Sequence, residues 1–151
     1  MKRMKPKIMI IASGGGHLTE AMIALESFNK EEILFVSYPL PHLKVRNDIK
    51  MVFIRNPHTQ ILNYIINSWQ SFKIYFKYRP SIIISTGAGV AITMFILGRI
   101  MGSKTIFIES GARILYPSKT GRLLYFFSHH FFIKSELLKP FYPKAVLINA
   151  L

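Results

Sequence analysis

The chain has 151 residues, no cysteine and a formal net charge of +13, and half of its residues are hydrophobic, with a mean hydropathy of +0.29. This length allows one domain with a substantial core, so we expect a single domain over residues 1–151. The lack of cysteine excludes disulfides and thiolate metal sites, and it is consistent with a reducing cytoplasm.

The positive charge is concentrated in the later part of the chain. Up to Asp48 there are seven Lys or Arg against five Asp or Glu, whereas from Ile49 onward thirteen basic residues stand against two acids, Glu109 and Glu136. We expect this part to attract phosphate-rich partners, such as nucleic acid, anionic lipid or a diphosphate substrate. A solvated basic surface without a ligand is the alternative interpretation.

The first predicted elements are an apolar strand over residues 7–12, a glycine turn over 13–17 and a helix over 17–28. Glycines allow bare backbone N–H groups to approach a ligand beside the positive end of a helix, which suits a phosphate. A tight connection without a ligand would use the same residues. The fingerprint G-x-G-x-x-G is absent and no acid ends the second strand, so a nicotinamide or flavin is disfavoured and we expect no cofactor.

Strands and helices continue to alternate along the chain, which predicts an α/β fold with a doubly wound, mostly parallel sheet. Further strands are expected over residues 31–37, 50–54, 81–85, 103–108, 130–133 and 145–149. Helices are expected over residues 59–78 and 90–101, over a short stretch ending at 127, and as one turn near 136–137.

Two of these helices are unusually apolar. The helix over 59–78 has more aromatic residues than one core stripe needs, and Lys73, Lys77 and Arg79 gather at its end, so it is either a core helix or an interfacial helix on anionic lipid. The helix over 90–101 is apolar on every side, and we expect other protein or lipid to cover it. Residues 82–101 together could pass for a membrane span, but glycines interrupt them, and we predict a strand, a turn and a helix.

Three loops follow strands that should end at one edge of the sheet: 13–17, 85–89 and 109–113. They would bring backbone donors, an imidazole, a carboxylate and a guanidinium to one crevice, where open α/β sheets bind ligands. His17 alone could simply start a helix, and Glu109 alone could pair with Arg113. The candidate binding residues are Ser13, Gly14, Gly15, Gly16, Thr86, Gly87, Ala88, Gly89, Ser110, Gly111 and Arg113.

These three loops, continued by the segment from Pro117 to Tyr125, resemble the Alg14 family, with bacterial members of the PssD and EpsE type from capsular and exopolysaccharide synthesis. The resemblance covers nearly the whole chain. It implies the Rossmann-like N-terminal half of a split GT-B glycosyltransferase, which handles the acceptor and the membrane. An Alg13-like or PssE-like partner would supply the half that holds most of the nucleotide sugar. We see no N-terminal anchor like that of eukaryotic members, so we expect peripheral association with the cytoplasmic face of a membrane that carries anionic lipid.

The resemblance also implies a reaction, the inverting transfer of a hexose (GlcNAc, Glc or Gal) from a UDP-sugar to a polyprenyl-diphosphate-linked sugar, active only with the partner. Such a transfer needs a base for the acceptor hydroxyl and positive potential for the departing UDP. Glu109 or His17 is the expected base, the glycine turns the expected diphosphate donors and Arg113 the expected clamp. No metal ligand set is expected.

Two other classes of function stay open from the sequence. A non-catalytic membrane scaffold could recruit and activate the partner subunit. A basic nucleic-acid-binding module would explain the charge, but no helix-turn-helix, RNP-like or zinc pattern is present.

Overall fold

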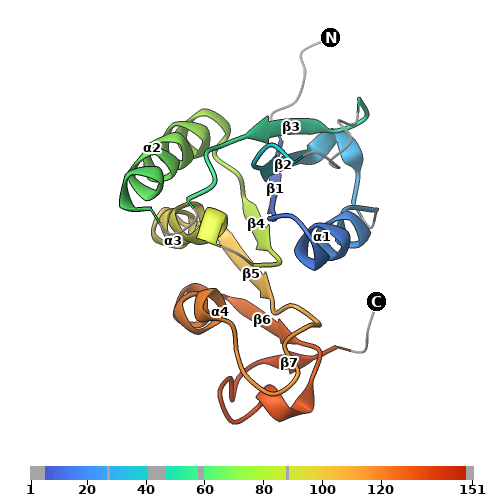
Figure 1. Ribbon diagram of the computed structural model, residues 1–151. Helices are drawn as coiled ribbons and strands as arrows, with labels where there is room; N and C mark the ends of the chain where they lie inside the picture. Colours follow the sequence, from blue (N-terminus) through green and yellow to red (C-terminus); the bar gives the residue numbers. More distant parts are fainter. Residues whose placement is uncertain (1–5, 27, 41–46, 58–59, 88, 149–151) are drawn as a thin grey trace.

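In a computed structural model of the chain, residues 6–26, 28–40, 47–57, 60–87 and 89–148 are described. They form one seven-stranded sheet in the order β3-β2-β1-β4-β5-β6-β7, and every neighbouring pair is parallel (Figure 1). The strands are β1 (Ile8–Ile11), β2 (Ile33–Ser37), β3 (Lys50–Phe53), β4 (Ile82–Ser85), β5 (Lys104–Ile108), β6 (His130–Ile133) and β7 (Val146–Leu147). The predicted parallel α/β sheet is confirmed.

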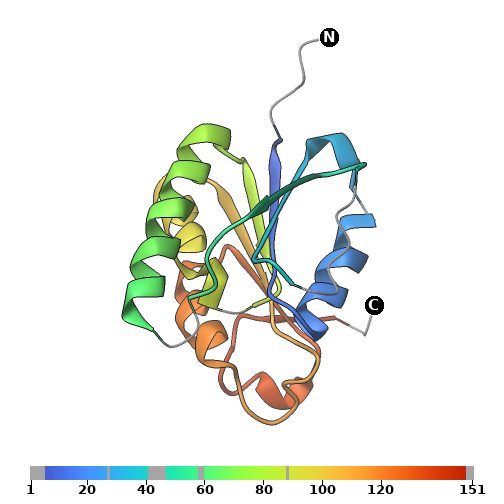
Figure 2. The same ribbon diagram turned by 45° about the horizontal axis from the view of Figure 1, so that its top comes forward.

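Helices cover both faces of this sheet, as in a Rossmann-like, doubly wound fold. Helix α1 lies on one face, and α2, α3 and α4 lie on the other (Figure 2). The α-helices are α1 (Gly16–Glu26), α2 (Ile61–Tyr78), α3 (Ile92–Ile100) and α4 (Lys119–Leu124). Short 3-10 helices are η1 (Lys30–Glu32), η2 (Gly89–Ala91), η3 (Tyr125–Phe127) and η4 (Glu136–Leu138).

The strand β1 shows how the two faces share the apolar residues. Met9 and Ile11 belong to the core under α2, α3 and α4, whereas Ile8 and Ile10 belong to the core under α1. Successive side chains of a strand point to opposite faces. A strand covered on both sides must therefore be apolar at every position, which is the pattern that predicted it.

Two sequence predictions were wrong in detail. Glu31 and Glu32 do not extend β2, because the Asn29 side chain accepts a hydrogen bond from the Glu31 N–H at 3.3 Å and caps η1 instead. The apolar helix α3 needs little cover from outside, since Met94 and Phe95 are fully buried and only the end of the helix, at Ile100, is largely exposed.

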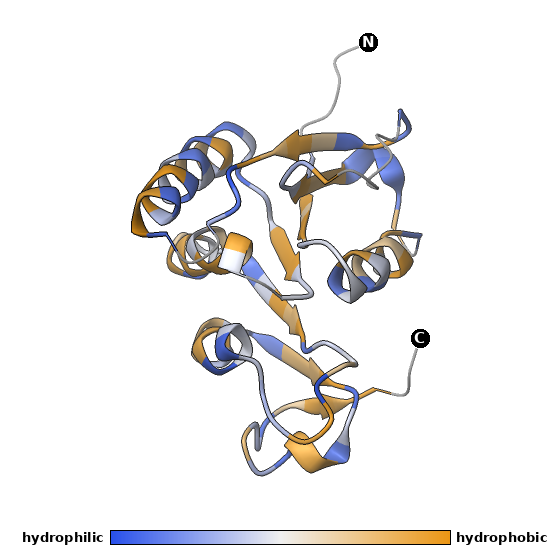
Figure 3. Cartoon of the chain, in the orientation of Figure 1, coloured by the Kyte–Doolittle hydropathy of each residue, from blue (hydrophilic) through white to orange (hydrophobic). Residues whose placement is uncertain are grey.

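Helix α2 exposes a row of large apolar side chains, and apolar and hydrophilic colours alternate along its ribbon in Figure 3. Its inward side contains the fully buried Asn67 and Ser71 beside Ile74 and Tyr75. Its exposed large side chains are Ile61, Leu62, Ile65, Trp69, Phe72 and Phe76. Within the described residues, no helix combines the length and hydropathy needed to cross a bilayer.

The contact of α3 with the sheet yields a first prediction. A Cβ added at Gly98 would collide with Cδ1 of the fully buried Ile83, whereas a Cβ at Gly16 would meet open space. We expect Gly98→Ala to lower the free energy of unfolding by about 1–3 kcal/mol because the core cannot expand freely. Gly16→Ala should leave it unchanged or raise it slightly. Urea denaturation of both variants checks this, and equal stabilities would contradict the packing described.

Candidate functional site

The candidate site lies where the winding of the sheet changes direction, between β1 and β4. The chain proceeds from β1 outward to β2 and β3, then returns to β4 on the other side of β1 and continues to β7. The connections after β1 and β4 therefore leave toward opposite faces. Open α/β sheets bind ligands at the carboxyl edge beside such a point, and we call this position the crevice. The turn over residues 13–17 and the turn that begins at Thr86 border this crevice.

Two reciprocal hydrogen bonds join these turns. The Nδ1 atom of His17 lies 2.5 Å from the carbonyl oxygen of Thr86, and Oγ1 of Thr86 donates to the carbonyl oxygen of His17 at 2.8 Å. A carbonyl only accepts, so Nδ1 carries the proton in the first bond. In the neutral ring Nε2 is then left with a lone pair, as a base requires.

Gly87 provides the space for the His17 ring. Its φ is +123°, and a Cβ there would lie 2.7 Å from the Cε1 atom of His17. Its N–H donates to Oγ of Ser85 at 3.2 Å. We expected this N–H to bind a diphosphate, but the bond to Ser85 already engages it. Gly89 packs against Tyr64, whose hydroxyl would lie 2.9 Å from an added Cβ, and Ala88 lies outside the described residues.

The first glycine turn leaves the amino end of α1 accessible. Gly15, with φ of +75°, and Gly16 are both exposed, while Ser13 is buried and the Gly14 N–H donates to the hydroxyl of Tyr38 at 3.3 Å. The first N–H groups of a helix have no partner within it and face a positive dipole end, so this position suits a phosphate. Among the described residues, no three His, Asp or Glu side chains come together as metal ligands.

Glu109, after β5, is fully buried and fully engaged. Its Oε2 accepts from the Tyr142 hydroxyl at 2.9 Å and from Oγ and N–H of Ser118 at 3.1 and 3.2 Å. Its Oε1 accepts from the N–H of Ser110 at 3.2 Å. The carboxylate therefore does not reach the crevice, and its partners are these groups rather than Arg113. The structure thus offers no support for Glu109 as the base.

The Glu109 carboxylate anchors the start of α4. Ser118 is the N-cap of this helix, and its Oγ accepts from the Gly121 N–H at 2.8 Å. A side chain at Gly121 would occupy the space of the Glu109 carboxylate and the Tyr142 hydroxyl. Glycine is thus required there for the carboxylate, the helix cap and the phenol to meet.

A second buried carboxylate ties the third loop to α1. The Oε1 atom of Glu20 accepts from the Gly111 N–H at 2.9 Å and from Nζ of Lys134 at 3.0 Å, and both side chains are mostly buried. The N–H of Gly111 is therefore engaged, whereas Arg113 is exposed on the same loop. The three predicted loops do converge at one edge of the sheet. His17 and Thr86 join the first loop to the second, and Glu20 of α1 holds the third loop at Gly111.

Sequence analysis missed several residues of this arrangement. Ser118 had a recognisable signal, since a serine after proline and before a short helix is a typical N-cap. Tyr142 and Lys134 had none, because they contact Glu109 and Glu20 across 33 and 114 residues of chain. Tyr64 appeared only as one of many aromatic residues in its helix.

Tyr142 has a perturbed acidity. Burial raises its pKa well above the usual range of a phenol, and the charge of Glu109 and the hydrogen bond that Glu109 accepts raise the pKa further. Arg122 and Arg113 offset part of this rise. The phenol therefore stays protonated and remains a donor to Glu109.

The model of the family described as "Oligosaccharide biosynthesis protein Alg14 like" matches residues 49–151. The human "UDP-N-acetylglucosamine transferase subunit ALG14" is 22% identical over 94% of this chain and 81% of that protein. The protein of the same name from Yarrowia lipolytica is 25% identical, over 95% and 80%.

Two solved structures share the fold. MurG of Acinetobacter baumannii superimposes with a TM-score of 0.73 at 14% identity, over 97% of this chain and 46% of MurG. A UDP-N-acetylglucosamine 2-epimerase from Rickettsia bellii gives 0.72 at 10% identity, over 93% and 42%. This chain thus spans less than half the length of either structure and corresponds to one Rossmann-like half of such a protein.

The hydrogen bond between Tyr142 and Glu109 gives a prediction for the stability of the fold and its dependence on pH. Tyr142→Phe removes a hydrogen bond to a buried carboxylate and should cost about 1–3 kcal/mol at neutral pH. Above the ordinary phenol pKa of about 10, the unfolded chain releases the Tyr142 proton and the native state does not, so wild-type stability falls as pH rises.

Tyr142→Phe should lose this alkaline component, which chemical denaturation between pH 7 and 11 measures. Tyr116→Phe, at an exposed tyrosine, is the matched control and should retain both the stability and the slope. If the stability of Tyr142→Phe falls with rising pH as steeply as that of the wild type, the Tyr142 phenol ionises normally in the native state.

Proposed function

The chain belongs to the Alg14 family, and from this premise we propose that it is the acceptor-binding, membrane-associating subunit of a two-component UDP-sugar glycosyltransferase. The reaction would add a hexose to a polyprenyl-diphosphate-linked sugar. The relatives' names favour GlcNAc as that hexose. The likeness to less than half of MurG supports a site completed by a second, Alg13-like or PssE-like chain.

His17 is the proposed catalytic base, and its bond to Thr86 is the observation that carries this proposal. Nδ1 is occupied by the backbone carbonyl, so the ring is oriented and Nε2 can accept a proton. In an inverting transfer, Nε2 takes the proton of the acceptor hydroxyl while the hydroxyl oxygen attacks the anomeric carbon. The bond from that carbon to the UDP oxygen breaks, and UDP leaves with the electron pair.

The exposed amino end of α1 and Arg113 are proposed to bind a diphosphate. Gly15 and Gly16 place the first N–H groups of α1 at the crevice, where the helix dipole favours anions. The guanidinium of Arg113, on the third loop, can form charge-assisted hydrogen bonds to phosphate. Whether this diphosphate belongs to the donor or to the acceptor depends on how the partner closes the site.

Membrane association is proposed to use the exposed side of α2. Its apolar side chains would enter the interface between headgroups and hydrocarbon, and its basic residues would face anionic lipid. The Nζ atom of Lys73 lies 5.1 Å from the Trp69 ring centre, and Lys77 lies near the same end of the helix. This arrangement places cations beside the aromatic residues, as an interfacial helix requires.

The role of His17 is tested in the assembled pair of subunits. His17→Ala should lower kcat by about 10²–10⁴-fold, the usual contribution of a positioned base, with little change in unfolding. His130→Ala is the control and should keep full turnover. His130 is the first residue of β6 and therefore lies at the amino edge of the parallel sheet, away from His17. Full turnover of His17→Ala would instead mean that this chain is a scaffold for a catalytic partner.

The membrane surface is tested by vesicle sedimentation. Leu62→Glu places a charge on the exposed side of α2 and should weaken binding to anionic vesicles by about tenfold or more, since burying one leucine is worth about 1.5–3 kcal/mol. Leu137→Glu adds the same charge at another exposed leucine, on η4. If Leu62→Glu and Leu137→Glu weaken vesicle binding equally, the net charge of the protein controls this binding and the α2 surface does not.

A further inference from the structure

Helix α1 carries two side chains that hold the other loops of the site. His17 and Glu20 are three residues apart in this helix, so they lie on the same side of it. The ring of His17 bonds to the carbonyl oxygen of Thr86, after β4. The carboxylate of Glu20 accepts from the N–H of Gly111, after β5, at 2.9 Å. One helix therefore fixes the second and third loops relative to its own amino end.

The contact at Gly111 also fixes the backbone of Arg113, because both belong to one tight turn. The N–H of Arg113 donates to the carbonyl oxygen of Ser110 at 2.9 Å, and the N–H of Ala112 donates to Oγ of Ser110 at 3.3 Å. Ser110 itself is buried. The turn is thus held internally, and anchoring it at Gly111 anchors the segment that carries the Arg113 guanidinium.

The anchor is a close-packed contact. A Cβ added at Gly111 would lie 3.3 Å from Oε1 of Glu20 and 3.3 Å from Cδ of Lys134. The side chains of Glu20 and Lys134 are only 15% and 13% exposed. The turn therefore has little room to shift against α1 while Glu20 is in place.

The charge of Glu20 is balanced where it lies. Nζ of Lys134 donates to the same Oε1 atom at 3.0 Å, so the carboxylate does not repel an anion bound nearby. Oε2 of Glu20 is buried and has no hydrogen-bond partner among the described residues. Replacing a buried ion pair by apolar residues is often neutral or stabilising. Stability alone therefore does not account for a carboxylate at this position.

We propose that Glu20 is a positioning residue for diphosphate binding, because it holds the turn of Arg113 against α1. The inference rests on the proposed function, in which Arg113 and the amino end of α1 bind one diphosphate. A guanidinium binds phosphate oxygens in a defined, often bidentate geometry, so a shifted turn loses much of the interaction. Glu20 acts through Arg113 and does not itself contact the diphosphate.

Titration calorimetry of the full chain with inorganic diphosphate tests this role. Glu20→Ala should weaken binding by about tenfold, the worth of one charge-assisted hydrogen bond, although it makes the protein more positive. Glu136→Ala removes the same charge at an exposed position on η4 and should leave the affinity equal or slightly higher. Glu20→Gln retains an oxygen that accepts from Gly111 and should restore most of the affinity. Unchanged or tighter binding by Glu20→Ala overturns the proposal.

A double-mutant cycle shows whether Glu20 acts through Arg113. Arg113→Ala should weaken diphosphate binding by about tenfold, since it removes the guanidinium itself. Adding Glu20→Ala to Arg113→Ala should then cost less than about a further twofold, because no guanidinium is left to position. Wild-type affinity in Arg113→Ala overturns the proposal, as does an undiminished effect of Glu20→Ala in that background.

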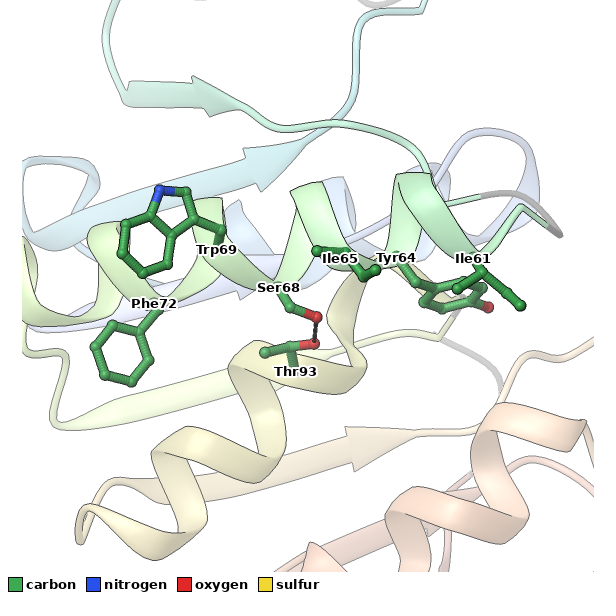
Figure 4. A pocket seen from close by; sticks show the side chains of 7 residues that line it. All are labelled: Ile61, Tyr64, Ile65, Ser68, Trp69, Phe72 and Thr93. Carbon is green, nitrogen blue, oxygen red and sulfur yellow. Dashed lines mark hydrogen bonds between the residues drawn. The ribbon is translucent and has the colours of Figure 1, made fainter.

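Two further variants separate positioning from a general loss of packing. Oγ of Ser68, on α2, and Oγ1 of Thr93, on α3, lie 2.8 Å apart in a hydrogen bond on the other face of the sheet (Figure 4). Thr93→Val removes this bond and should leave diphosphate affinity unchanged, and a loss equal to that of Glu20→Ala overturns the proposal. If Glu20→Ala fails to fold because Lys134 is left buried without a counter-charge, combining it with Lys134→Met removes both charges and should show the same weakening.

Failure of the proposed function is seen separately. Diphosphate binding by the full chain does not require hexose transfer, so the assembled pair of subunits is assayed for transfer in parallel. No transfer together with the expected binding results rejects the proposed reaction and supports the positioning role of Glu20. A wild-type chain that binds no diphosphate overturns the positioning role, whatever the pair transfers.

Discussion

The pair of hydrogen bonds between His17 and Thr86 is the contact on which the site depends. It crosses the gap between β1 and β4, where the connections of the sheet turn toward opposite faces. Without it, the two glycine turns would be separate loops at a sheet edge. With it, the imidazole is held against Gly87, and the amino end of α1 is fixed beside the turn whose Gly89 packs against Tyr64 of α2.

The acidic residues near the crevice serve the structure. Glu109 holds the start of α4 and Tyr142, and Glu20 holds Gly111 and Lys134. Protein donors therefore engage both oxygens of Glu109 and the Oε1 atom of Glu20. What the crevice presents is the end of a helix dipole, an imidazole and the exposed Arg113, a combination that favours an anionic ligand.

Helix α2 differs from an ordinary surface helix because it has large apolar side chains on its outward side as well as in the core. A helix on a soluble domain normally turns its apolar side to the core. Here Asn67 and Ser71 are buried while Ile65 and Trp69 are exposed. The Nδ2 group of Asn67 donates to the Arg55 carbonyl at 2.8 Å, so one polar contact on the inward side has a structural purpose. The outward side instead exposes large apolar side chains, which agrees with the proposed contact with lipid.

The sequence by itself determined the order of the strands and helices, the parallel sheet and the family. Those properties follow from local patterns: continuous apolar runs for doubly covered strands, glycine after each strand of the site, and the segment from Glu109 to Tyr125. It also indicated which three loops would meet, because carboxyl ends of parallel strands share an edge.

Only the tertiary structure decided where each residue of those loops lies and what it contacts. Glu109 and His17 were equal candidates for the base, and our proposal of His17 rests on the contacts of Glu109 with Tyr142 and of His17 with Thr86, which are distant in sequence and close in space. Likewise, the amphipathic pattern of α2 could not show which side faces the sheet. Burial and hydrogen-bond partners arise from packing between distant segments, so local sequence patterns do not contain them.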